Sequence, residues 1–190
     1  EWPHRQDLHL LASVKRPTKR AVFGGVRCSV AVLVRRWLGW SAGKLLVLDI
    51  GGGSLEIASG VDELPEATLS LPLGAARSTR EFLGADPYTS KGIKSLEKHA
   101  EEMLKNSIPQ TLLSHDANHF VATSKTFRTL ARICAHGYGD NPKFLEKKSL
   151  ETAVPKLVAM NNKSRAELPG VSASRAQQIV AGGIVALAVM

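Results

Sequence analysis

The chain has 190 residues, a formal net charge of +8 and 44% hydrophobic residues, which is typical of one sizeable globular domain or two small ones. Its two cysteines, Cys28 and Cys134, argue against a disulfide framework or a zinc site and fit a reducing cytoplasm. No apolar run reaches the roughly 20 residues of a membrane span, and the first residues do not predict a secretory signal.

The positive charge is concentrated at one end of the chain. Residues 1–44 contain nine Lys or Arg and two Asp or Glu, whereas residues 45–190 contain sixteen and fifteen. No RRM, zinc-finger or homeodomain signature accompanies the excess, so we interpret it as a solvated basic arm rather than a nucleic-acid surface. Residues 1–28 lack a convincing hydrophobic period, and we expect this atypical basic segment to be poorly ordered.

Strands are predicted in the first half of the chain. The pattern over 29–40 fits a short helix or a strand, and periodicity does not decide between them. A continuous apolar run predicts a buried strand over 45–50. A tight glycine turn joins it to a second strand over 55–59, and an alternating stretch over 67–74 predicts a third. Together they form a meander.

Helices dominate the second half. A short helix is predicted to end at Gly84, and an amphipathic helix begins at Ser90, its expected N-cap, and ends before Pro109. A fourth strand over 119–124 precedes a helix that we expect Gly137 to cap.

Two further helices follow that one. One is predicted over 149–161, with Pro155 inside it, and the last over 172–190, capped by Ser172 or Ser174. The order of elements predicts an α/β layered unit, in which ligands bind beyond the strand ends.

The stretch "DIGGGSLE", Asp49 to Glu56, contains the residues with the clearest chemistry. Three successive glycines permit a sharp turn and a close approach to a ligand, and their N–H groups can form an anion-binding nest. Ser54 and Glu56 point to one face of the returning strand, while Asp49 ends the preceding strand, where it can hold a cation or a water. The motif is neither a Walker A loop nor a dinucleotide fingerprint, and a plain hairpin remains the alternative.

A second cluster of hydroxyl groups lies in "TSKT", Thr123 to Thr126. These hydroxyls precede a predicted helix, whose N-terminus suits an anion, and Lys125 and Arg128 would add positive charge. An ordinary N-cap flanked by solvated basic residues explains the same pattern equally well.

Three stretches occur in one order: "DIGGGSLE", then "LSLPLGAARSTREFL", then "VATSKTFRTLARI". Their combination resembles the exopolyphosphatase/guanosine pentaphosphate phosphatase family, Ppx/GppA, and "VRRWLGWSAGKLLVLDIGGGSLEIASG" looks like its actinobacterial branch. The likeness extends from about Val34 to Met190. It implies a lobe of the actin-like (ribonuclease H-like) ATPase superfamily. We expect residues 29–190 to be the second lobe, truncated at its C-terminus and preceded by the atypical segment 1–28.

The resemblance also implies roles for individual residues. Asp49 and Glu56 match the carboxylates that the family uses to hold a divalent metal, Mg²⁺ or Mn²⁺, and the attacking water, so both are catalytic and metal-binding candidates. The phosphate-binding candidates are Gly51, Gly52, Gly53, Ser54, Ser124 and Thr126. Arg77 matches a basic position of the family, although a surface salt bridge explains it as well.

The sequence departs from the family at two places. It lacks a first "DxGSNS"-like phosphate loop, and "VFGGVRC" (22–28) stands where family members place an acidic run that includes the general base. Gly24, Gly25 and Val26 cannot accept a proton from water. One hypothesis is that residues 1 to about 28 come from a disrupted or frame-shifted reading of the gene, which the upstream DNA would test.

Three functions are left open. The first is a phosphoanhydride hydrolase that releases terminal phosphate from polyphosphate or guanosine pentaphosphate (pppGpp), impaired in this truncated chain. The second is a non-catalytic lobe that binds a phosphate-rich ligand, and the third, ranked lowest, is a basic nucleic-acid binder. We expect no membrane partner. The face left open by the missing lobe predicts self-association, with a homodimer as one form.

Overall fold

The structure is a computed structural model that describes residues 7–10, 29–113 and 117–190. Within this part of the chain, six strands form one sheet in the order β4-β3-β2-β5-β1-β6. Their bounds are β1 Asp7–Leu10, β2 Leu45–Ile50, β3 Leu55–Gly60, β4 Ala67–Leu71, β5 His119–Ala122 and β6 Phe144–Glu146. The sheet is mixed: β2, β3 and β4 pair antiparallel as the predicted meander, and β5 runs parallel to β2.

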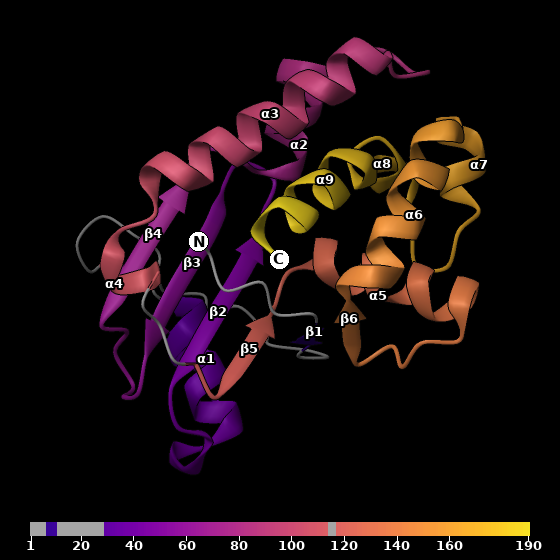
Figure 1. Ribbon diagram of the computed structural model, residues 1–190. Helices are drawn as coiled ribbons and strands as arrows, with labels where there is room; N and C mark the ends of the chain where they lie inside the picture. The colour runs from indigo at the N-terminus through magenta and orange to yellow at the C-terminus, as the bar shows by residue number, and fades with distance from the viewer. Residues whose placement is uncertain (1–6, 11–28, 114–116) are drawn as a thin grey trace.

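Helices cover both faces of the sheet (Figure 1). Their bounds are α1 Ser29–Leu38, α2 Ala75–Ser78, α3 Ser90–Ser107, α4 Gln110–Leu113, α5 Lys125–Tyr138, α6 Lys147–Ala159, α7 Asn162–Ala166, α8 Ala173–Ala176 and α9 Ile179–Val189. A 3₁₀ turn, η1, covers Trp40–Ala42, and a π-helical turn, η2, covers Thr79–Leu83. This arrangement confirms the predicted α/β lobe.

Strand β2 is buried along its whole length because it packs against helices on both faces. Leu46, Leu48 and Ile50 belong to the main core, which α3, α5 and α9 complete. Leu45 and Val47 point to the other face, where they pack with Val34 of α1 and Val121. A continuous apolar strand is therefore what this central position requires.

Helix α9 packs closely against two other helices, and two glycines permit this approach. A β-carbon at Gly182 would lie 2.5 Å from Cγ2 of Thr126 on α5, and one at Gly183 would lie 2.8 Å from Cγ2 of Val154 on α6. Both distances are shorter than carbon atoms tolerate. Helix α9 is apolar around its circumference because neighbouring elements enclose it.

Two predicted helix boundaries are wrong by one or two residues, and one predicted helix is divided in two. Thr89, not Ser90, caps α3, since its hydroxyl oxygen accepts a hydrogen bond from Gly92 N at 3.1 Å. Helix α5 continues past Gly137 to Tyr138 and is capped by Gly139, whose φ of 78° places it in the left-handed conformation that ends the helix. The predicted last helix is two helices, α8 and α9, separated at residues 177–178.

The basic N-terminal segment contributes one element. Asp7–Leu10 forms β1, which pairs with β5 and β6 and which the sequence pattern did not reveal. The rest of residues 1–28 lies outside the described residues, together with Cys28 and the positions Gly24, Gly25 and Val26. The expectation of poor order there stays a prediction.

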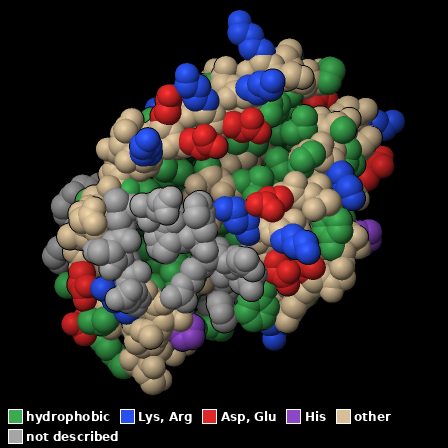
Figure 2. All heavy atoms as spheres, in the orientation of Figure 1, with side chains coloured by type: hydrophobic (Ala, Val, Ile, Leu, Met, Phe, Trp, Pro, Cys, Tyr) green, Lys and Arg blue, Asp and Glu red, His purple; other side chains and the backbone are tan. Residues whose placement is uncertain are grey.

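On the face shown in Figure 2, apolar side chains lie in the furrow between α3 and α6. Ile184, Leu187 and Ala188 of α9 form the floor of a hollow of about 250 Å³, and its remaining lining consists of Glu97, Glu101, Lys147 and Glu151. Three carboxylates against one lysine make this hollow unsuited to a phosphate. No helix in the described part of the chain combines the length and hydropathy that crossing a membrane requires.

Candidate functional site: a pocket at the glycine loop

The loop from Gly51 to Ser54 joins β2 to β3 and is tied to the start of α2. Gly51 N–H donates to the carbonyl of Ser54 at 2.8 Å, which closes the turn. The carbonyls of Gly51 and Gly52 accept hydrogen bonds from the backbone N–H groups of Ala75 and Arg77, each at 2.9 Å. In contrast, the N–H groups of Gly52 and Gly53 donate no hydrogen bond within the described residues. The loop therefore turns its carbonyls to the protein and leaves backbone donors for a ligand.

The fold itself does not require glycine at positions 51, 52 and 53. None of them has a positive φ. A β-carbon at Gly51 or Gly52 would make its nearest contact at 3.4 or 3.8 Å, and one at Gly53 would meet nothing within 4 Å. A sharp turn alone therefore does not explain the three glycines, because other residues fit this backbone sterically. What the three glycines provide is an uncovered backbone that a ligand can approach closely.

Sterics do require glycine at a fourth position, Gly74, which was not among the residues predicted from the sequence. Its β-carbon would lie 2.3 Å from Gly53 C and from Ser54 N, so the backbone before α2 lies directly against the loop. The "PLGA" stretch contains the signal, a glycine before a short helix, but the partner 20 residues upstream is visible only in the structure. Gly74 supports the loop from behind.

Asp49 and Glu56 are opposite each other on β2 and β3. Asp49 is buried, and its Oδ2 accepts a hydrogen bond from the Thr123 hydroxyl at 2.9 Å. Glu56 is half-buried, and its Oε1 lies 3.5 Å from Ser54 Oγ. Opposed side chains on an antiparallel pair have β-carbons about 5 Å apart, so the two carboxylates are neighbours on one face of the sheet.

The turn after β5 provides the second wall of the site. Ser124 caps α5, with its Oγ accepting from Phe127 N at 3.1 Å, and its own proton remains available for donation. The Thr126 hydroxyl donates to the carbonyl of Ile50 at 3.0 Å, so it joins α5 to the end of β2. A hydroxyl has one proton, and while this bond holds, Thr126 cannot also donate to a phosphate.

The two walls meet in a pocket of about 440 Å³. Its lining comprises Ile50, Gly51, Gly52, Thr123, Ser124, Lys125, Thr126, Arg128, Arg175 and Gln178. Within the part of the chain that the structure describes, three cationic side chains and the N-terminus of α5 therefore surround one space, and no carboxylate belongs to the lining. Such a pocket attracts anions.

Only some of the site residues predicted from the sequence line the pocket. Gly51, Gly52, Ser124 and Thr126 line it, together with the two flanking cations Lys125 and Arg128. Gly53 and Ser54 lie in the same loop without lining the pocket, and Asp49 and Glu56 form the carboxylate pair beside it. Arg77 forms an ion pair with Glu81 at 3.1 Å on the exposed side of its helix. This is the surface salt bridge that the sequence analysis gave as the alternative to a functional role for Arg77.

Arg175 and Gln178 are the lining residues that the sequence analysis did not single out. They come from the junction of α8 and α9, about 50 residues after the α5 wall. Their three-residue spacing places both on one face of a helical turn, but the same spacing fits an ordinary helix surface.

The carboxylate pair is also a candidate metal site. Within the described residues, no three His, Cys, Asp or Glu side chains converge. Mg²⁺, however, is commonly held by only one or two protein carboxylates plus phosphate oxygens and water. Asp49 and Glu56, which face each other beside an anion-attracting pocket, fit that requirement.

These features define an α/β lobe with a glycine-rich loop and a positively charged pocket at the carboxyl ends of β2 and β5. The sequence profile of the Ppx/GppA phosphatase family matches residues 28–190. Exopolyphosphatase 1 of Mycobacterium tuberculosis is 47% identical over 161 residues, which cover 83% of this chain and 47% of the relative. Its counterpart from Mycobacterium leprae is 46% identical over 83% of this chain and 48% of the relative. The chain belongs to the Ppx/GppA phosphatase family, and the resemblance found in the sequence is confirmed.

Solved structures show the same fold. The Aquifex aeolicus Ppx/GppA family member superimposes with a TM-score of 0.69 at 24% identity, covering 84% of this chain and 52% of that one. An exopolyphosphatase from Cytophaga hutchinsonii superimposes with a TM-score of 0.62 at 20% identity, covering 78% and 50%. The chain spans about half the length of the relatives and structures that it matches.

Proposed function

We propose that this lobe binds the phosphates of inorganic polyphosphate or of pppGpp and contributes half of the site at which a terminal phosphoanhydride bond is hydrolysed. The observation that supports it is the pocket, where the glycine loop, the N-terminus of α5 and three cationic side chains surround one space, with no carboxylate among its described lining residues. Phosphoanhydrides have several closely spaced negative charges, which this combination neutralises.

The residues in and around the pocket have distinct roles in the proposed phosphate binding. Backbone N–H groups of the loop and the Ser124 hydroxyl donate to phosphate oxygens, and Lys125, Arg128 and Arg175 compensate their charge. Thr126 and Gly74 keep the two walls in place. Asp49 and Glu56 would hold Mg²⁺ or Mn²⁺, which supplies charge neutralisation at the phosphate when bound.

We also propose that the 190 residues alone hydrolyse slowly. A general base must lie within hydrogen-bond reach of the attacking water, and among the described residues no carboxylate lines the pocket. The same observation supports a second candidate, a lobe that binds phosphate-rich ligands without turning them over. Binding and turnover therefore need separate measurements.

The test of binding is calorimetric titration of the chain with tripolyphosphate and with pppGpp in the presence of Mg²⁺. Removing one charge-assisted contact by Lys125→Ala should weaken binding about tenfold, because such hydrogen bonds are each worth about 1.5–3 kcal/mol before solvent exposure reduces them. Lys94→Ala is the matched control, since Lys94 is exposed on α3 and does not line the pocket. No binding of either ligand, or equal effects of the two substitutions, would refute the proposal.

The test of turnover is phosphate release from the same two substrates. We expect slow release that Asp49→Asn and Glu56→Gln each abolish, with Asp62→Asn in the exposed β3–β4 loop as the control. Binding without release selects the non-catalytic candidate. Release that persists in both variants would contradict the roles given to the carboxylates.

A further inference from the structure

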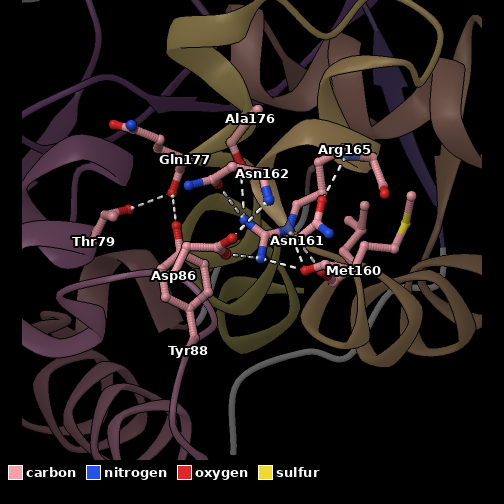
Figure 3. Close-up of polar contacts among 11 residues, drawn as sticks. Thr79, Asp86, Tyr88, Met160, Asn161, Asn162, Arg165, Ala176 and Gln177 are labelled. Carbon is pink, nitrogen blue, oxygen red and sulfur yellow. Dashed lines mark hydrogen bonds and ion pairs between the residues drawn. The ribbon is translucent and has the colours of Figure 1, made fainter.

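Arg165 is completely buried at the meeting point of α6, α7, α8 and the loop before α3 (Figure 3). Its guanidinium donates to Asp86 Oδ1 at 2.6 Å, to Asn162 Oδ1 at 2.7 Å and to the carbonyl of Ala176 at 3.2 Å. It also donates to the carbonyls of Leu157 at 2.9 Å and Met160 at 2.6 Å. A buried guanidinium is tolerated only when its donors are satisfied in this way.

Tyr88 and Asp86 complete the cluster. The Tyr88 ring lies 4.6 Å from Cζ of Arg165, and its hydroxyl donates to the carbonyl of Gln177 at 2.6 Å. Burial raises the pKa of the Tyr88 phenol, an effect that the charge of Arg165 opposes, so the group is protonated and a donor at neutral pH. The second oxygen of Asp86 accepts from Asn162 N at 2.8 Å.

Two consecutive carbonyls at the α8–α9 junction are held by this cluster. Arg165 binds the carbonyl of Ala176, and Tyr88 binds that of Gln177, to which the Thr79 hydroxyl makes a longer contact of 3.3 Å. The helix is interrupted at this point, so side-chain donors replace regular helical partners for both carbonyls. The residues on either side, Arg175 and Gln178, line the pocket.

We propose that Arg165, acting with Asp86 and Tyr88, is a positioning residue that holds Arg175 and Gln178 at the wall of the phosphate pocket. The inference rests on the proposed phosphate binding at that pocket. The cluster lies behind the wall and does not line the pocket itself. Its effect on phosphate binding therefore passes through Arg175 and Gln178.

The first experiment uses Tyr88→Phe, which removes the hydroxyl and keeps the ring beside Arg165. Losing one hydrogen bond should weaken tripolyphosphate binding about 3- to 10-fold in calorimetric titrations. Backbone amides of residues 173–178 should exchange hydrogen faster, while those of the glycine loop should not change. Tyr138→Phe is the matched control, because Tyr138 lies partly exposed at the end of α5 with its ring over Lys156.

A double-mutant cycle separates positioning from a general loss of stability. In an Arg175→Gln, Gln178→Ala background both pocket side chains that the cluster positions are already altered, so Tyr88→Phe should weaken binding less than about twofold. Equal effects of Tyr88→Phe in both backgrounds would overturn the proposal. Unchanged exchange of residues 173–178 in Tyr88→Phe would overturn it as well.

Arg165→Lys gives a stronger perturbation, since a lysine keeps the charge but cannot reach Asp86 and the Ala176 carbonyl together. We expect a larger loss of affinity than in Tyr88→Phe, and if this variant does not fold, the Tyr88→Phe cycle decides. If the unaltered chain binds no tripolyphosphate, the proposed function fails. Hydrogen exchange in Tyr88→Phe then still shows whether the cluster holds the α8–α9 junction.

Discussion

Replacing Gly74 by alanine places one methyl group against the backbone of the glycine loop. The new β-carbon would lie 2.3 Å from Gly53 C, 2.3 Å from Ser54 N and 2.4 Å from Gly53 N. Nonbonded carbon contacts normally begin near 3.5 Å, so the loop and the start of α2 must separate by about 1 Å. That separation strains the hydrogen bonds by which the Gly51 and Gly52 carbonyls hold α2, both at 2.9 Å.

The expected cost is about 3 kcal/mol of folding free energy, the upper end for overpacking, because the atoms met are backbone and cannot rotate away. Gly74 has φ −75° and ψ 147°, which alanine adopts without strain. The substitution therefore also gains about 0.4–1 kcal/mol by restricting the unfolded chain. The net loss should be about 2 kcal/mol, measured as the shift in the urea unfolding midpoint at constant m-value.

Two controls define the result. Gly137→Ala, in a helix with nothing within 4 Å of the new β-carbon, should stabilise the protein by up to about 1 kcal/mol. Gly53→Ala, which also meets nothing, should leave stability nearly unchanged but weaken tripolyphosphate binding by covering the exposed loop backbone. Unchanged or increased stability of Gly74→Ala would refute the reasoning that the backbone at Gly74 supports the loop.

Three further predictions follow from individual contacts. Gly182→Ala should lower stability by about 1–3 kcal/mol through its clash with Cγ2 of Thr126, and adding Thr126→Ser, which removes that methyl group, should restore most of the loss in urea unfolding. Burial, with help from nearby carboxylates, raises the pKa of Cys134 from 9.0 to about 12. Above pH 9 the Cys134 thiol ionises readily only in the unfolded state, so the free energy of unfolding should fall by about 1.4 kcal/mol per pH unit up to about pH 12. Cys134→Ala should show a correspondingly smaller slope, and equal slopes would contradict the assignment. Thr123→Val should cost about 1–3 kcal/mol because it removes a hydrogen bond to the buried Asp49 carboxylate, and a change below 0.5 kcal/mol would show that other partners suffice.

The elements that the sequence predicted well are those encoded by short-range patterns. Strand β2 is an uninterrupted apolar run, and the glycine loop and the returning strand β3 follow it directly. The ends of helices could not be predicted to the residue where two residues suited to capping stand close together. Thr89 and Ser90 can both cap a helix, and Gly137 and Gly139 can both end one, so the choice depends on geometry that the sequence does not contain.

Features made by distant residues could not be predicted in this way. Arg165 and Asp86 are 79 positions apart, and no periodicity links a buried arginine to its carboxylate. At the interruption between α8 and α9, the carbonyls of Ala176 and Gln177 accept from donors of the same distant cluster, and these partners cannot be read from the local pattern that predicts one helix over 172–190. For the same reason Arg175 and Gln178 were missed as lining residues of the pocket.

The two adjacent glycines of α9 have a mechanical consequence. Gly182 faces Thr126 on α5 and Gly183 faces Val154 on α6, each at a separation that leaves no room for a methyl group. Helices in such close contact on two neighbouring faces cannot slide past one another without breaking both contacts. The α5 wall of the pocket is therefore packed rigidly against α9, the helix that follows Arg175 and Gln178. When a ligand enters, we expect α5, α6 and α9 to move together as one rigid block, and any opening or closing of the pocket to come from the glycine loop.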